Sequence, residues 1–358
     1  MTRFLRLVAI LGVAVVLPAC GNTGGGTSVP ADGKPQVAIV TNCADPFWDI
    51  CAAGAKKAGT DFGVEVIFRQ PIQLSVDEQT KTVDDVVRLG LKGLAVSVVD
   101  PAEQTKKMAV IAQDLPNNNF ITIDNDADKS GRLCYVGVDN FEAGKEAGKM
   151  VKYALPNGGT IGLFIGTTDS ANAKARLAGV LTELGGKDVR DDVAKRVFQP
   201  KYGNYMLHAG QPVTDEGKKD KAEQNAGAFM DEYATKADVC FVGLYAYNPA
   251  KALEQARKKG LVGKVHIVGF DEDLVTLEGI QKGEIVGSVS QDPYGYGYET
   301  VKWLKHVIDG KDKKELPQTA TKYSIVTKDG KPLPNTTPGI QAKKAEDYYK
   351  TVADAIKK

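Results

Sequence analysis

Gln36-Val-Ala-Ile-Val-Thr41 and the adjoining Asn42-Cys-Ala-Asp-Pro-Phe-Trp48 decide the fold. The first run is short, apolar and rich in β-branched residues, which predicts a buried strand. Pro46 then begins a helix, because proline is well tolerated at the first helical position. We expect that helix to end near Phe62. A buried strand that leads directly into a helix is the first half of a βαβ unit.

The same alternation of strand and helix runs along the whole chain in two rounds. Because the strands are nearly continuous in apolar residues, they predict parallel sheets covered on both faces by helices. The expected fold class is therefore α/β, with two doubly wound parallel-sheet lobes. We expect an irregular surface loop at 199–217, although this segment could also line the mouth of a cleft. The further strands are expected at 64–68, 93–98, 120–123 and 133–137, then at 159–165, 193–198, 239–244, 266–270, 285–289 and 323–326.

The N-terminus predicts export. Arg3 and Arg6 precede an apolar run at 7–17, which is too short for a membrane helix and typical of a signal peptide. Leu17-Pro-Ala-Cys20-Gly resembles the lipobox of bacterial lipoproteins, which implies cleavage before Cys20 and its acylation. Ordinary cleavage after Ala19 is the alternative. We expect a lipoprotein signal peptide at 1–19, a flexible glycine-rich tether at 20–34, and a lipid-anchored protein in the periplasm or at the cell surface.

Charge and cysteine content narrow the classes of partner. Removing residues 1–19 takes away two arginines and no acids, which leaves 44 basic and 45 acidic residues and a net charge of −1. No nucleic-acid partner is therefore expected, because phosphate binding needs clustered positive charge. An exported protein can form disulfides, so Cys43 could pair with Cys51, and Cys134 and Cys240 are either a second pair or buried thiols. No spacing of Cys and His typical of a metal site occurs.

Polar and aromatic residues gather directly after the expected strands. In doubly wound sheets ligands bind beyond the carboxyl ends of the strands, so these residues are expected to share one site. Aromatic rings stack on the C–H faces of a sugar, and planar charged groups bind its vicinal hydroxyls in pairs. The pattern therefore predicts a site for a small polyhydroxylated ligand. The expected ligand-binding residues are Asp45, Phe47, Trp48, Asp124, Asn125, Arg176, Tyr245, Asp271 and Gln291.

Six short motifs occur along the chain in this order: Asp45-Pro-Phe-Trp48, Ile121-Thr-Ile-Asp124, Val138-Asp-Asn140 with Gly144, Arg176-x-x-Gly179, Val268-Gly-Phe-Asp271 and Ser288-Val-Ser-Gln291-Asp-Pro-Tyr294. Together they resemble the periplasmic sugar-binding proteins of ABC importers, of the ribose-binding type with the type I periplasmic binding protein fold. The resemblance covers residues 35–327 and implies that Asp45, Phe47 and Trp48 form the wall of the first lobe. Asp45 and Asn125 stand where ribose binders carry Asn and Arg, so ribose itself is in doubt.

The resemblance also implies the domain organisation. It implies an N-terminal lobe at 35–138 and 292–324 and a C-terminal lobe at 139–291 and 325–358, joined by a three-strand hinge. The implied function is that of a monomeric solute-binding component which captures a pentose or hexose by hinge closure and delivers it to an ABC permease, without a cofactor.

Other functions remain as alternatives. A sensor that presents its ligand to a chemoreceptor or histidine kinase would share the fold and the site. A nucleoside, a cyclitol or a furanone-type signal would also suit the polar inventory. Asp124 and Asp271 could suggest glycoside hydrolysis, but the resemblance to binding proteins argues against it. The sequence also contains neither a nucleophile elbow nor a Walker motif, and we expect no enzyme.

Overall fold

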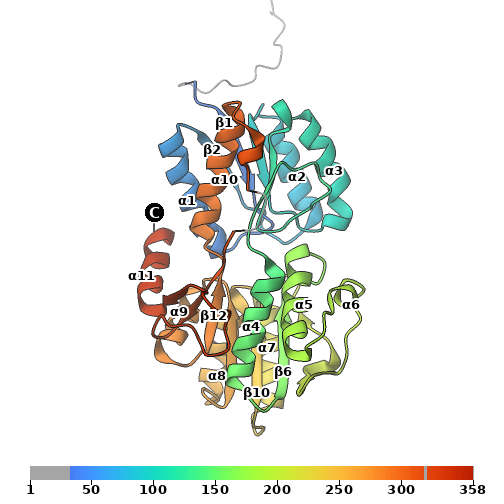
Figure 1. The fold of residues 1–358 in the computed structure, drawn as a ribbon, viewed down its shortest axis with the longest axis vertical. Coiled ribbons are helices and arrows are strands. Elements are labelled where there is room, and N and C mark those ends of the chain that lie inside the picture. The colour runs from blue at the N-terminus through green and yellow to red at the C-terminus, as the bar shows by residue number, and fades with distance from the viewer. Residues whose placement is uncertain (1–32, 318–320, 358) are drawn as a thin grey trace, which may run out of the picture.

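Two sheets, each covered by helices on both faces, lie one above the other in the protein (Figure 1). The structure, a computed structural model, describes residues 33–317 and 321–357. The first sheet has the order β2-β1-β3-β4-β5, and all its neighbours run parallel. Its strands are β1 (Gln36–Val40), β2 (Glu65–Arg69), β3 (Gly93–Val96), β4 (Phe120–Ile123) and β5 (Tyr135–Val136).

Alternate residues of these strands enter two different cores. Val37 and Ile39 of β1 pack under α1 (Pro46–Phe62) and α10 (Pro293–Ile308), whereas Ala38 and Val40 pack under α2 (Val76–Val87) and α3 (Pro101–Asp114). This follows from the two-residue period of a strand, and it explains why the strands are apolar throughout. The short 3₁₀ turn η1 (Pro116–Asn118) leads from α3 into β4.

Side chains cap the first helices of the upper lobe. Asp100 accepts a hydrogen bond from the Ala102 amide and caps α3, and the Ser75 hydroxyl accepts one from the Glu78 amide at the start of α2. The carboxylate of Glu78 accepts hydrogen bonds from the amides of the preceding loop, at Ile72 and Gln73. Side-chain acceptors therefore satisfy the free amides at both helix starts.

The second sheet is mixed at its edges. Its central strands β6 (Gly159–Ile165), β10 (Val239–Gly243), β11 (Val265–Phe270) and β12 (Gly287–Ser290) are parallel. β13 (Ser324–Thr327) runs antiparallel to β12, and β14 (Ala342–Lys344) is paired with it at the edge. On the other side β8 (Tyr205–Leu207) pairs with β6, β7 (Lys201–Tyr202) pairs with β8, and β9 (Val213–Thr214) pairs with the end of β6.

Helices cover both faces of this second sheet as well. α4 (Asn140–Ala154) and α5 (Ala171–Gly185) contribute to the core on one face, and α7 (Lys219–Glu232), α8 (Tyr247–Lys259) and α9 (Leu274–Lys282) cover the other. The C-terminal helix α11 (Ala345–Ile356) packs against α9 and also reaches α1 of the upper lobe (Figure 1). Two short 3₁₀ turns, η2 (His208–Gly210) and η3 (Lys313–Glu315), complete the described elements.

The segment between α5 and α7 differs from expectation. The strand predicted at 193–198 is wrong, because the helix α6 (Arg190–Ala194) lies there and residues 195–200 form no strand. Asp191 and Asp192 occupy its first turn, where acidic side chains favour a helix. The segment 199–217 is not irregular throughout, since it supplies β7, β8 and β9 to the edge of the second sheet.

The chain passes between the two sheets three times, after β5, after β12 and before β13. The first and third passages lie side by side, since Val138 and Thr321 form a β-bridge and the Thr321 amide donates to the Gly137 carbonyl over 2.6 Å. The Tyr296 hydroxyl accepts from the Val138 amide (2.9 Å) and donates to Oε1 of Gln291 (3.1 Å), which ties the first passage to the second. The predicted α/β fold with two parallel-sheet lobes is confirmed.

The predicted signal peptide, the lipidation site Cys20 and the tether up to residue 32 lie outside the described residues. Within the described ranges, no helix combines the length and apolar character needed to cross a bilayer. The same ranges contain no group of three or more His, Cys, Asp or Glu side chains placed to hold a metal ion.

Candidate functional site

A cavity lies between the lobes, where the carboxyl ends of both sets of strands face each other. Its volume is about 60 Å³, well below the roughly 300–1,000 Å³ that is usual for small-ligand sites. Eight of the nine predicted ligand-binding residues line it. They are Asp45, Phe47, Trp48, Asp124, Arg176, Tyr245, Asp271 and Gln291.

The start of α1 forms the wall of the upper lobe. Asp45 caps the helix, with Oδ1 accepting a hydrogen bond from the Phe47 amide over 3.1 Å. The rings of Phe47 and Trp48 meet edge to face with centroids 5.0 Å apart, and the Trp48 indole N–H donates to Oδ1 of Asn42 (3.0 Å). Both rings also belong to the core of this lobe, so the core holds them rigid at the cavity surface.

Asp124 lies directly after β4 and is almost fully buried. Its backbone adopts a left-handed conformation (φ 58°), which turns the chain sharply at the strand end. Oδ2 accepts hydrogen bonds from the Ser97 hydroxyl (3.2 Å) and the Asn172 amide group (3.3 Å). Burial raises the pKa of Asp124 to about 7; Arg176 opposes this shift and Asp271 adds to it. The site therefore contains a carboxyl group that takes up a proton near neutral pH.

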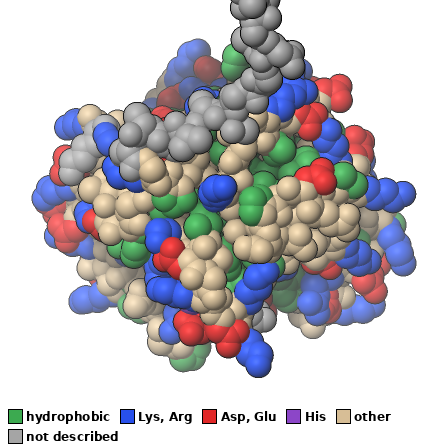
Figure 2. All heavy atoms as spheres, turned by 90° about the horizontal axis from the view of Figure 1, so that it is seen from above, with side chains coloured by type: hydrophobic (Ala, Val, Ile, Leu, Met, Phe, Trp, Pro, Cys, Tyr) green, Lys and Arg blue, Asp and Glu red, His purple; other side chains and the backbone are tan. Residues whose placement is uncertain are grey.

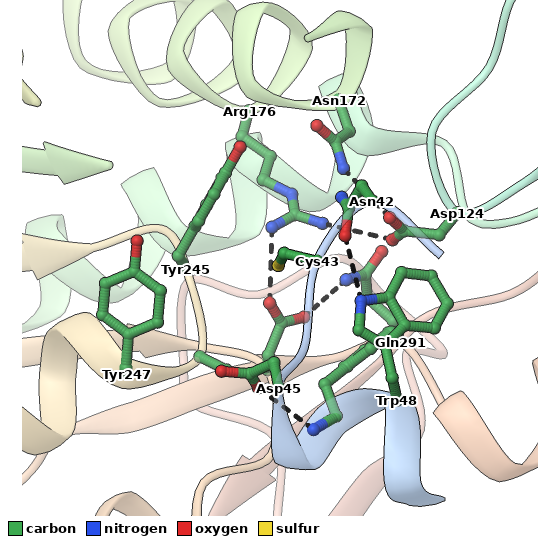
Figure 3. A pocket seen from close by; sticks show the side chains of 13 residues that line it. Asn42, Cys43, Asp45, Trp48, Asp124, Asn172, Arg176, Tyr245, Tyr247 and Gln291 are labelled. Carbon is green, nitrogen blue, oxygen red and sulfur yellow. Dashed lines mark hydrogen bonds and ion pairs between the residues drawn. The ribbon is translucent and has the colours of Figure 1, made fainter. Parts of the chain in front are cut away.

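Arg176 reaches from α5 into the cavity, where its guanidinium points toward Asp124 (Figure 3). Its Nη1 lies 3.4 Å from Oδ2 of Asp271, and its Nη2 lies 3.9 Å from Oδ1 of Asp124. Nε donates to Asn140 and Nη1 to the Leu244 carbonyl, both over 2.8 Å. Burial disfavours its charge, but the two carboxylates outweigh this effect and raise its pKa.

The close packing of α4 against α5 explains how Arg176 is held there. A Cβ on Gly144 would lie 2.4 Å from the Arg176 carbonyl oxygen, and one on Gly179 would lie 2.2 Å from that of Phe141. The two helices can approach this closely only with glycine at both positions.

Asp271 and Gln291 come from the ends of β11 and β12. Asp271 is buried, has a left-handed backbone (φ 69°), and accepts a hydrogen bond from the Gln291 carboxamide at Oδ1. Burial raises its pKa, while Arg176 and Gln291 act in the opposite direction. Asp271 does not cap the next helix, because the N-cap of α9 is Asp273.

Two tyrosines form the wall opposite Trp48 (Figure 3). Tyr245 and Tyr247 follow β10, and their rings meet edge to face with centroids 6.1 Å apart. Tyr245 lies within hydrogen-bond distance of the Ser170 hydroxyl (3.3 Å), and its ring passes over Gly166, where a Cβ would come within 2.3 Å of it. Tyr245 therefore faces the cavity and does not pack under the sheet.

Asn125 does not line the cavity. It is fully buried. Its side-chain Nδ2 donates to the Val98 carbonyl, and its Oδ1 accepts a hydrogen bond from the backbone N–H of Asn172 (3.0 Å). The left-handed turn at Asp124 directs the next side chain away from the cavity. The geometry gives Asn125 a structural contact between the lobes, and we leave it out of the proposed ligand contacts.

Comparison with known proteins decides the family. A model of the periplasmic binding protein domain matches residues 37–312. The chain belongs to this family. The predicted resemblance is thereby confirmed, and so is the expectation of a binding protein in place of an enzyme.

Characterised relatives of this periplasmic binding protein are distant. It is 24% identical to the D-ribose/D-allose-binding protein of Pseudomonas aeruginosa, over 78% of this chain and 84% of the relative. A solute-binding protein from Burkholderia graminis, solved with D-arabinose, is 24% identical, with a TM-score of 0.71 over 83% of this chain and 96% of that one. GanP, a glucose-galactose-binding protein from Geobacillus stearothermophilus, is 24% identical, with a TM-score of 0.69 over 84% and 99% of the chains. These structures share the fold.

Sequence reasoning missed four polar or aromatic side chains that line the cavity of this periplasmic binding protein. Asn42 and Cys43 lie in the loop after β1, and Tyr247 begins α8 just after β10, so the strand-end rule could have found them. Asn172 lies one helical turn before Arg176 on α5, and only the shared helix face indicates it.

The four cysteines of the described residues are free thiols, so neither of the disulfides considered, Cys43–Cys51 or Cys134–Cys240, is present. Cys43 is half-buried at the cavity, and burial next to Asp45 and Asp124 raises its pKa to about 12. A thiol with so high a pKa is a poor nucleophile near neutral pH.

Proposed function

We propose that this protein captures a single small sugar, a pentose or a hexose, between its two lobes and presents it to an ABC permease. The observation that carries the proposal is the convergence of aromatic rings from both lobes around Asp124, Arg176 and Asp271 in one cavity. The relatives that bind ribose, allose and arabinose by name support the ligand class but not the particular sugar.

The chemistry of the cavity fits a sugar. Phe47 and Trp48 on one side and Tyr245 and Tyr247 on the other offer faces to the C–H groups of a ring. Asp124 offers Oδ1, which lies 3.9 Å from Nη2 of Arg176. A ligand hydroxyl near this oxygen could donate to the carboxylate and accept from the guanidinium. Such charge-assisted hydrogen bonds discriminate strongly against a ligand that lacks the hydroxyl.

We further propose that the three passages form the hinge. The lobes would comprise 35–138 with 292–324, and 139–291 with 325–358. A sugar that touches both lobes binds fully only to the closed state, so binding shifts the population from open to closed. Tyr296, which contacts two of the passages, would keep them aligned during this motion.

A thermal-shift screen of pentoses, hexoses, polyols and nucleosides, followed by calorimetry, tests the proposed function. In the Asp271→Asn variant a buried carboxylate is lost from the site, which costs about 2–5 kcal/mol of binding. The affinity for the best sugar should therefore fall by at least about 30-fold. Arg88→Ala, at an exposed residue of the upper lobe, is the matched control for Arg176→Ala. Binding that is unchanged in both Asp271→Asn and Arg176→Ala, or a nucleoside as the only ligand, would contradict the proposal.

We propose that the protein is exported and anchored by acylation of Cys20. Mass spectrometry of the membrane fraction should find a diacylglycerol on Cys20, and Cys20→Ser should release the protein from membranes. Loss of sugar uptake in a strain that lacks the gene would support the transport role, whereas normal uptake with a lost transcriptional response would favour a sensor. We expect a monomer in light scattering.

A further inference from the structure

The segment between β9 and α7 lies at the edge of the cavity, and Asp215 holds it in place. Asp215 is buried, and its Oδ1 accepts hydrogen bonds from the Tyr247 hydroxyl (2.6 Å) and the Gly217 amide (2.9 Å). Its Oδ2 accepts from the Asn248 carboxamide over 2.9 Å. The end of the 199–217 segment is therefore fixed to a tyrosine of the cavity wall, and so is the start of α7.

Three lysines crowd the first turn of α7, where the helix dipole disfavours positive charge. Lys218 and Lys221 are both paired with Glu216 of the same segment, over 3.0 and 2.6 Å. Lys219 instead pairs with Asp45 of the other lobe, with Nζ 3.0 Å from Oδ2. The positive charge of Lys219 is unfavourable for the start of a helix, which indicates a role in function. Natural sequences depart from local structural preferences mainly at functional sites.

Asp45 is well placed to receive this lysine. Its side chain is only 11% exposed, and Oδ1 already caps α1. Oδ2 is the atom that Lys219 approaches. Both carboxylate oxygens of Asp45 thus interact with other groups of the protein, so Asp45 is a poor candidate for binding ligand hydroxyls.

A second contact brings the same two lobes together nearby. Gly217 lies against Leu74 of the loop after β2, so closely that a Cβ on Gly217 would be 3.0 Å from that of Leu74. Gly217 also has a left-handed backbone (φ 73°), which favours glycine. Both contacts join residues of different lobes, so opening of the hinge would separate them.

We propose that Lys219 and Asp45 form an ionic clasp across the mouth of the cavity, which stabilises the closed state and slows the release of the bound ligand. This inference rests on the proposed function. Lys219 acts as a positioning residue, since it does not line the cavity.

The effect of the clasp on the rate of sugar release can be measured by stopped-flow fluorescence of Trp48, with the sugar identified by the screen. Lys219→Met keeps the length of the side chain and removes its charge. Because Lys219 is about half exposed, we expect the dissociation rate to rise by about 2- to 5-fold, the range of an exposed ion pair, with little change in the association rate. Asp45→Asn, which can still cap α1, should have the same effect, and the double variant should be no worse than either single one.

Lys221→Met is the matched control, because Lys221 pairs within its own lobe, and Lys219→Arg should restore slow release. High salt should abolish the difference in dissociation rate between wild type and Lys219→Met.

If Lys219→Met released sugar at the wild-type rate at low salt, the clasp would be refuted while the proposed function stood. If the wild type bound no sugar, small-angle scattering of the ligand-free proteins would decide: the clasp predicts a larger radius of gyration for Lys219→Met, and equal radii would overturn it.

Discussion

Replacing Asp124 by Asn should make the ligand-free protein more stable at alkaline pH while it weakens sugar binding. The folded state raises the pKa of this buried carboxyl from 3.8 to about 7. A raised pKa means that the folded state binds the proton more tightly than the unfolded chain. The wild type therefore loses stability as the pH rises from about 4 through about 7, and an uncharged Asn avoids this loss.

The size of the effect follows from the shift. Roughly three pKa units at 1.36 kcal/mol each give about 4 kcal/mol. The difference in unfolding free energy between Asp124→Asn and wild type should grow by about this amount between pH 4 and pH 8. Glu272, whose pKa burial also raises, is present in both proteins, so its titration largely cancels in the difference.

Urea unfolding followed by circular dichroism, at pH 4, 6 and 8 without ligand, provides the measurement. Asp128→Asn, at an exposed position close in sequence, is the control and should follow the wild type at every pH. A difference for Asp124→Asn that stays constant from pH 4 to pH 8 would refute the reasoning, because it would mean that Asp124 is ionised in the folded protein throughout.

Further predictions concern the helix pair, the hinge and the thiols. Gly144→Val should force α4 away from α5 and displace Arg176, which should cost about 1–3 kcal/mol of stability in thermal unfolding and abolish sugar binding in calorimetry. Tyr296→Phe removes the hydroxyl shared by two hinge passages and leaves the buried Val138 amide without its partner; denaturant unfolding should show a loss of about 1–3 kcal/mol. Cys43 should react slowly with iodoacetamide at neutral pH, and the four described cysteines should all titrate as thiols in denaturant without a reducing agent; fewer thiols would indicate a disulfide.

Most of the fold could be predicted because its signals are local. Pro46 begins a helix at the expected position, and the buried strands are apolar on both faces. The strand β14 and helix α11 were missed, because a three-residue strand that includes two lysines has no apolar pattern. β14 depends on its pairing with β13, which is a tertiary contact.

The site was predictable where topology alone delivers a residue to the cavity. Asp124 and Asp271 directly follow buried strands, and parallel strands end at the same edge of a sheet. Asn125 also follows a buried strand, but it does not line the cavity. The reason is the left-handed backbone of Asp124, which residue types alone do not predict. The partnership of Asp45 with Lys219 spans 174 positions between two lobes, so no local pattern indicates it.

A crystal structure with the best sugar from the screen tests the central claim most directly. The account predicts electron density for one ring between Trp48 and Tyr245, with hydroxyls bonded to Asp124, Arg176 and Asp271 and with both lobes in contact with the ligand. Density on the outer surface, or density that touches only one lobe, would contradict it.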